Sequence, residues 1–145
     1  MNWKYFGRPW GKCEECWASY GRGIQHENSL RCYKLGIPVR ALKVGLEEFI
    51  RLLEEKGYTG KYTIFSFPIS LASKGVVILY FESREEMEKA ISELSKYTMT
   101  EPKDKFFFDR FVNVDWINGF NYRRGCPEYD EVFGDWRKWK NRDKK

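Results

Sequence analysis

Four cysteines and one histidine are the residues of this chain with the most distinctive chemistry. Cys13, Cys16, His26 and Cys32 follow one another with the spacing C-x2-C-x9-H-x5-C. Thiolates and imidazoles are ligands of tetrahedral Zn²⁺, and a tight C-x2-C pair supplies two of them from one turn. We therefore expect these residues to bind zinc, with Cys126 as an alternative fourth ligand. Free thiols, or a disulfide in an oxidising compartment, remain open alternatives.

The sequence lacks the common catalytic arrangements. A single histidine leaves no Ser-His-Asp or Cys-His pair with an orienting partner. The stretch Gly21-Arg22-Gly23 is too short to be a phosphate-binding loop of the Walker type. The H-x-E and P-C-x-x-C motifs of zinc deaminases are absent around His26 and Cys13. We therefore expect a protein that is not an enzyme, with zinc as its one candidate cofactor.

The composition of the chain favours a nucleic-acid partner. Aromatic residues make up 18% of its 145 residues, and the formal net charge is +5. Aromatic rings stack on bases and cations meet phosphates, so this combination suits an RNA-binding surface. The chain has no stretch of 18 apolar residues, which a membrane-spanning helix would need. Its N-terminus also has no long apolar segment of the secretory type. We expect an intracellular protein without a membrane partner.

Hydrophobic periodicity predicts the elements that must position these residues. Leu42, Leu46, Phe49, Ile50 and Leu53 recur at helical spacing, and a glycine follows the last turn. Segments dense in β-branched and aromatic residues predict strands. The predicted strands are 30–35, 61–67, 76–81 and 106–114, and the predicted helices are 42–53 and 84–97.

The order of these elements is β-α-β-β-α-β, which is the ferredoxin-like pattern. It predicts an α+β fold in which two helices cover one face of a four-stranded antiparallel sheet. The predicted domain covers residues 30–115. An aromatic and basic N-terminal extension, 1–29, carries the candidate zinc ligands, and a basic, aromatic C-terminal extension spans 116–145.

Within this domain, the stretch Ser73–Ser83 resembles the longer signature of the RNA-recognition motif (RRM) family, a basic residue and glycine followed by alternating aromatic and aliphatic residues. The run Tyr33–Pro38 is similar to the family's shorter signature on the first strand. The resemblance covers residues 30–115. It implies an RNA-binding protein that uses the helix-free face of its sheet.

Strand alternation predicts which side chains occupy that face. Side chains expected to point toward the helices are Val77, Leu79 and Phe81, whereas those expected on the open face are Lys74, Val76, Ile78 and Tyr80. Typical RRM proteins have aromatic residues at the positions of Val76 and Ile78. Their replacement leaves Tyr33 and Tyr80 as the candidate stacking rings, with Lys74 as a nearby cation.

The segment Asp115–Phe120, followed by Arg123 and Arg124, resembles the post-strand segment of the small subunit of the nuclear cap-binding complex. That resemblance implies that Tyr33 stacks on a methylated guanine cap, with a second ring from the N-terminal extension. The candidates for that ring are Tyr5, Trp10, Trp17 and Tyr20. It also implies guanine-edge contacts from Asp115 and Trp116, triphosphate contacts from Arg123 and Arg124, a larger protein subunit as partner, and a nuclear location. Ile117 departs from the family, which has an acidic residue there.

Two functions therefore follow from the sequence. The first is RNA binding, with a methylated guanine cap as a specific ligand. The alternative is an RRM-like protein-interaction module, because an aliphatic sheet face, with Val76 and Ile78 on it, also suits a partner protein.

Overall fold

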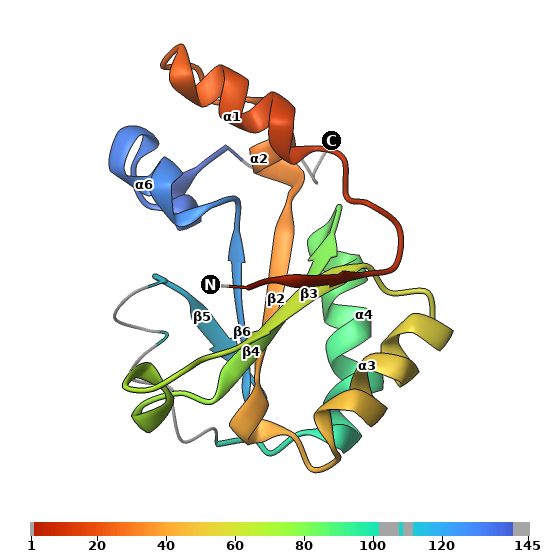
Figure 1. The fold of residues 1–145 in the computed structure, drawn as a ribbon. Coiled ribbons are helices and arrows are strands. Elements are labelled where there is room, and N and C mark those ends of the chain that lie inside the picture. Colours follow the sequence, from red (N-terminus) through yellow and green to blue (C-terminus); the bar gives the residue numbers. More distant parts are fainter. Residues whose placement is uncertain (1, 102–107, 109–111, 141–145) are drawn as a thin grey trace.

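A computed structural model describes residues 2–101, 108 and 112–140 of the chain. The protein is an α+β molecule whose described residues form a six-stranded antiparallel sheet and five α-helices (Figure 1). The strands are β1 (Lys4–Phe6), β2 (Tyr33–Pro38), β3 (Gly60–Ile64), β4 (Gly75–Phe81), β5 (Asp115–Ile117) and β6 (Phe120–Arg124). The helices are α1 (Cys13–Gly21), α2 (Glu27–Arg31), α3 (Leu46–Glu55), α4 (Arg84–Leu94) and α6 (Pro127–Phe133). The spatial order of the strands is β1-β3-β4-β2-β6-β5.

The sheet is wider than the sequence predicted. The expectation of four strands is wrong, because β1 pairs with β3 at one edge and β5 pairs with β6 at the other. Strand β1 lies before the predicted domain, 30–115, and β5 begins at its last residue. The sheet therefore extends past both predicted boundaries. The N- and C-terminal extensions are therefore parts of the same sheet and do not simply flank it.

The strand next to β2 is not the predicted one. Residues 106, 107 and 109–111 of the predicted strand 106–114 lie outside the described residues, while residues 108 and 112–114 are in no strand. The position beside β2 is taken by β6, which a tight hairpin joins to β5. Asn118 and Gly119 form its turn with φ angles of 50° and 84°. Asn-Gly is favoured in such turns, since both central residues need a positive φ.

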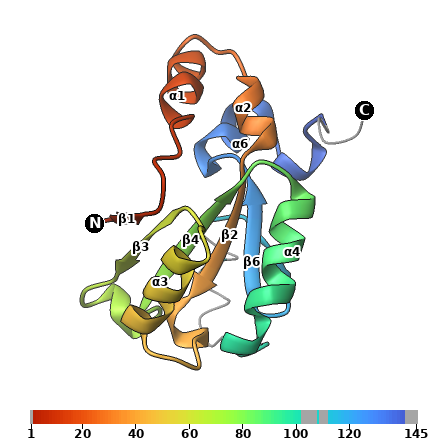
Figure 2. The same ribbon diagram turned by 90° about the vertical axis from the view of Figure 1, so that its right-hand side faces the viewer.

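The main core lies between the sheet and the helices α3 and α4, which cover the same face (Figure 2). Val77, Leu79 and Phe81 are buried in this core, as strand alternation predicted. The two predicted helices are also confirmed, although α3 begins later than expected, at Leu46. Ser83 caps α4 by accepting a hydrogen bond from the backbone N–H of Glu86 at 3.2 Å.

The remaining helices lie together at one end of the sheet. Helices α1, α2 and α6 come from opposite ends of the sequence, yet they gather beyond the ends of β2 and β6 (Figure 1). Among the residues that the structure describes, no helix is long and apolar enough to cross a membrane. The molecule thus has an open sheet face and a helical end, and both bear the residues of chemical interest.

Truncation of Leu79 tests the core. Its side chain is fully buried, so we expect Leu79→Ala to lower the free energy of unfolding by about 2–5 kcal/mol, through lost burial and a cavity. The control is Ile64→Ala, because Ile64 is 54% exposed and its truncation should cost less than about 1 kcal/mol. Urea unfolding followed by tryptophan fluorescence measures both. Equal losses would contradict this packing.

Candidate functional site

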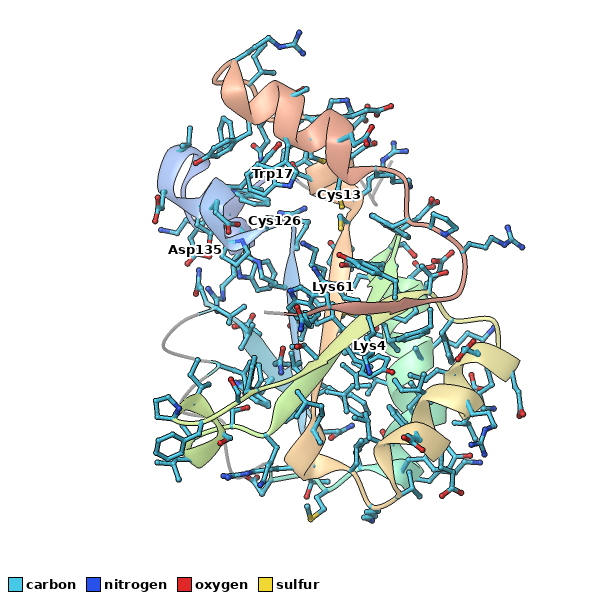
Figure 3. The ribbon with its side chains drawn as sticks, viewed as in Figure 1. Lys4, Cys13, Trp17, Lys61, Cys126 and Asp135 are labelled. Carbon is cyan, nitrogen blue, oxygen red and sulfur yellow. The ribbon has the colours of Figure 1, made fainter. Side chains whose placement is uncertain are left out.

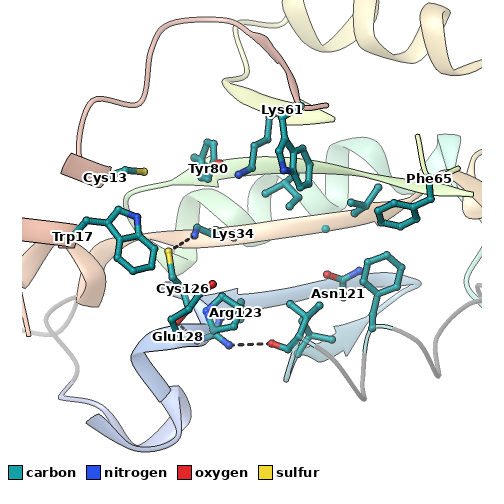
Figure 4. Close-up of a pocket in the computed structure, with 18 residues that line it drawn as sticks. Cys13, Trp17, Lys34, Lys61, Phe65, Tyr80, Asn121, Arg123, Cys126 and Glu128 are labelled. Atoms are coloured by element: carbon teal, nitrogen blue, oxygen red, sulfur yellow. Dashed lines mark hydrogen bonds between the residues drawn. The ribbon is translucent and has the colours of Figure 1, made fainter. Parts of the chain in front are cut away.

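The face of the sheet opposite α3 and α4 contains a cavity of about 400 Å³ (Figure 4). Its walls are mostly apolar, and its polar groups come from β2, β3, β6 and the start of α6. The residues that matter most for its chemistry are Trp3, Lys34, Gly36, Lys61, Ile78, Tyr80, Asn121 and Glu128. Val76, Ile78 and Tyr80 line it, so the predicted open-face alternation of β4 is confirmed.

The pairing register explains why this face is hollow. One cross-strand row runs over all six strands, in the order Tyr5, Lys61, Ile78, Gly36, Asn121 and Trp116. Gly36 stands in the middle of that row and has no side chain. A Cβ atom there would come within 2.0 Å of the Asn121 side-chain oxygen, so only glycine leaves room for Asn121.

Asn121 is the polar group in the floor of the cavity. Only 5% of the residue is exposed, and its side-chain nitrogen has no hydrogen-bond partner. An unmet buried donor costs about 1–3 kcal/mol, so a ligand that accepts from it gains that energy back. Asn121 therefore brings an unmet amide nitrogen to the floor of a mostly apolar cavity. Because that nitrogen has almost no exposed surface, a ligand can accept from it only after the side chain turns.

Two lysines give the cavity a positive charge. Lys34 donates a hydrogen bond to the Cys126 sulfur at 2.9 Å, and the Lys61 ammonium lies 4.3 Å from the centre of the Trp3 ring. Burial, together with the charge of Lys34, lowers the pKa of Lys61. Burial also acts to lower the pKa of Lys34, but Cys32 and Cys126 outweigh it and the pKa is raised. The cavity therefore suits an anionic or electron-rich ligand.

Trp10 and Tyr80 are two predicted residues that the fold does bring together. Their rings stack at a centroid distance of 5.3 Å and an interplanar angle of 23°. They border a second hollow of about 550 Å³, which is lined by the chain from Tyr5 to Gly11 and shares Cys13, Trp17, Lys61 and Tyr80 with the first cavity. The two hollows thus adjoin along the sheet face.

Part of the same face is closed by the protein itself. Phe65, Val76, Phe108 and Val114 form a small buried cluster, against which Trp3 packs. This cluster covers the part of the sheet face next to Trp116 of β5. The face is therefore not the fully open platform that the sequence predicted. Lys74 is exposed and does not line the cavity.

Tyr33 is not a stacking ring. It is only 5% exposed and belongs to the main core, with Leu35 and Ile37 on the same side of β2. Its cross-strand partner is Phe81, which also faces the helices. The prediction was wrong because Tyr33, Leu35 and Ile37 alternate along β2 and therefore share the face that the core covers.

Arg123 and Arg124 are used inside the protein. The Arg123 guanidinium forms a 2.7 Å ion pair with Asp130 and donates to the carbonyl oxygens of Val112 and Cys126. Arg124 donates to the carbonyl oxygens of Trp136, Trp139 and Lys140 at 2.7–3.0 Å. Both residues are at most 4% exposed. This placement does not agree with the expected triphosphate contacts.

Three further predicted residues also serve packing. Asp115 is paired with Arg137 at 2.6 Å. Trp116 lies edge-on to Phe108, with ring centres 6.3 Å apart. Tyr20 stacks on Tyr129 at 5.1 Å, which joins α1 to α6. The fold therefore does not bring together the residues that the cap-binding resemblance assigned.

The cysteines gather elsewhere. All four are unpaired thiols, and all four line one cavity of about 10 Å³ beside α1 and α6. Burial raises the pKa of Cys16 and of Cys32 to about 11. His26 is not among them, because its Nδ1 atom caps α2 by accepting from the backbone N–H of Asn28 at 3.0 Å. Across the described ranges, no three His, Cys, Asp or Glu side chains stand at metal-binding distances.

Comparison of the chain with protein-family models, with curated proteins and with solved structures finds no match. The site therefore has to be interpreted from its own geometry. Sequence reasoning missed Lys34, Lys61 and Asn121, although the Asn118-Gly119 pair is a hairpin signal that would have placed Asn121 on a strand.

Removal of the Arg123 charge tests its structural role. We expect Arg123→Met to lower the free energy of unfolding by about 3 kcal/mol, because it leaves the Asp130 carboxylate, 16% exposed, without its ion pair. Arg31→Met is the control, since the Arg31 side chain is 49% exposed and its pair should contribute less than about 1 kcal/mol. Urea unfolding measures both, and an Arg123→Met protein of native stability would refute the internal role.

Proposed function

We propose that this protein binds single-stranded RNA and that the sheet-face cavity holds one base. The observation that carries the proposal is the unpartnered amide nitrogen of Asn121, which lines a mostly apolar cavity that Lys34 and Lys61 also line. A base offers flat apolar faces and polar edges, so it can contact the walls and accept from Asn121 at the same time.

The size and lining of the cavity support a base as ligand. A volume of about 400 Å³ lies within the range of small-ligand sites, which are mostly apolar with a few placed polar groups. Trp3 offers a ring at the rim, half-buried and already against the Lys61 cation. A base that stacks on such a ring typically gains about 1–3 kcal/mol.

The cations and the adjoining hollows of the sheet face support a nucleic-acid strand, rather than a single nucleotide, as the ligand. Lys61 lines both adjoining hollows, while Lys34 lines the first and Arg8 lines the second. Phosphates that link neighbouring nucleotides would meet these cations while each base enters a hollow. The spatial order of the four inner strands, β3-β4-β2-β6, with two helices on one face, supports a ferredoxin-like unit of the kind that RRM proteins use for RNA.

The cavity gives less support to a methylated cap. A methylated guanine carries a positive charge, and Lys34 and Lys61 would repel it. We therefore expect a capped and an uncapped oligonucleotide to bind alike. If methylated cap analogue displaced the capped oligonucleotide and GTP did not, the protein would be a cap-binding protein after all.

A second candidate function has its own observation. The connection between β3 and β4 exposes several large apolar side chains, with exposed fractions from 44% to 77%: Ile64, Phe67, Ile69 and Leu71. Exposed apolar groups in one segment are typical of protein interfaces. This alternative would be favoured if the protein captured a partner protein, if Phe67→Ser and Leu71→Ser abolished that capture, and if RNA did not bind.

Lys61 provides the electrostatic test. RNA affinity should fall with salt, and we expect Lys61→Met to weaken binding and to reduce the slope of log K against log salt by about 1. Lys4→Met is the matched control, because Lys4 pairs with Tyr62 on the same two strands but points to the other face (Figure 3). Fluorescence anisotropy with a labelled single-stranded RNA measures both. Equal effects of the two variants would contradict the proposed face.

Asn121 provides the test of base recognition. A directed amide prefers some base edges over others, so the wild-type protein should discriminate among the four RNA homopolymers. We expect Asn121→Ala to reduce the largest affinity ratio among them by about tenfold, which corresponds to roughly 1.4 kcal/mol. Thermal unfolding of the variant provides the control for folding. Unchanged ratios in a folded variant would exclude Asn121 as the recognising group.

A further inference from the structure

The four cysteines reach their common cavity from three separate parts of the chain. Cys13 and Cys16 lie on the first turn of α1, Cys32 directly precedes β2, and Cys126 is the residue before α6 (Figure 3). Hydrogen bonds to backbone carbonyl oxygens hold these parts together. The Gly125 N–H donates to the carbonyl oxygen of Cys32 at 2.8 Å, and the Tyr129 hydroxyl donates to that of Cys16.

The size of this cavity suits a single ion. Its volume of about 10 Å³ is close to the space that one water molecule needs, and it is far too small for a multi-iron cluster. Tetrahedral zinc has Zn–S bonds of about 2.3 Å, and a cysteine sulfur moves between positions by rotation about one side-chain bond. Because no three potential ligands stand at metal-binding distances among the described residues, ligation requires the thiols that line the cavity to rotate toward one another.

The charges around the thiols suit a thiolate-bound cation. Lys34 approaches Cys126 as a hydrogen-bond donor, and an ammonium group can only donate, so the sulfur must accept (Figure 4). Zn²⁺ with four thiolates has a net charge of −2, which a neighbouring lysine partly neutralises. Lys12 also lines the cavity and adds a second cation.

The packing of α1 gives a structural reason for a metal. This helix of nine residues buries only Cys16 and Ser19, and its N-cap residue, Lys12, provides no side-chain cap. Apart from the ring contacts of Trp17 and Tyr20 with Tyr129, little apolar packing therefore holds α1 to the rest of the molecule. A metal bound through Cys13 and Cys16 on one side and Cys32 and Cys126 on the other would attach it firmly.

We propose that Cys13, Cys16, Cys32 and Cys126 together bind one structural Zn²⁺ ion, which fastens α1 to the start of β2 and the start of α6. His26 is not a ligand in this proposal, because it does not line the cavity that the four thiols share. The proposal does not depend on RNA binding, although Cys13, Lys34 and Cys126 line both this cavity and the larger one.

Metal analysis of the purified full-length protein is the first test. We expect about one zinc per chain, and after exchange with Co²⁺ we expect thiolate-to-cobalt charge transfer together with the visible bands of a tetrahedral site. This spectrum is recorded on the unaltered chain, so it does not depend on whether any variant folds. A disulfide, an iron–sulfur spectrum or absence of bound metal after reconstitution would each overturn the proposal.

Two variants identify the fourth ligand. Cys126→Ser should lose the charge-transfer band and most of the metal, whereas His26→Ala should retain both. Loss of metal from His26→Ala with retention in Cys126→Ser would overturn this ligand set. Chelation of the wild-type protein should also increase tryptic cleavage after Arg22 at least tenfold, because α1 is released, while residues 46–94 stay protected. Unchanged cleavage after metal removal would refute the fastening role.

Discussion

The antiparallel pairing of β2 with β6 is the constraint on which the rest of this structure depends. It places Gly36 opposite Asn121, which creates the hollow and its polar floor. One further backbone hydrogen bond, from the Gly125 N–H to the carbonyl oxygen of Cys32, extends this pairing and brings Cys32 close to Cys126. A slip of one residue would turn every side chain of β6 to the opposite face, so both candidate sites depend on this single register.

That pairing also explains how the segment 136–140 is held in place. Arg124 lies on β6 and donates three hydrogen bonds to carbonyl oxygens of this segment, and its guanidinium lies 5.7 Å from the centre of the Trp139 ring. Buried guanidinium groups need such partners, since an uncompensated buried charge is costly. Residues that composition associates with nucleic acid are thus used here for internal packing, and the surface that remains for a ligand rests on Lys34 and Lys61.

Lys34 connects the two sites. Its side chain lines the sheet-face cavity, and its ammonium donates to a sulfur of the cysteine cavity. A metal that fixes Cys126 would therefore also fix the position of this cation at the sheet-face cavity. In this arrangement the helical end of the molecule supports the sheet face, and the two cavities share Cys13, Lys34 and Cys126.

The sequence by itself determined part of the local structure. The 3.6-residue period of 42–53 and the alternation of β4 depend on near neighbours, so α3, α4 and the faces of Val77 and Ile78 were predictable. The tertiary structure alone decided the six-stranded width and the choice of Cys126 over His26 beside the other thiols. These depend on which distant strands pair and in which register. That choice is made by packing across the whole sheet, and no local spacing encodes it.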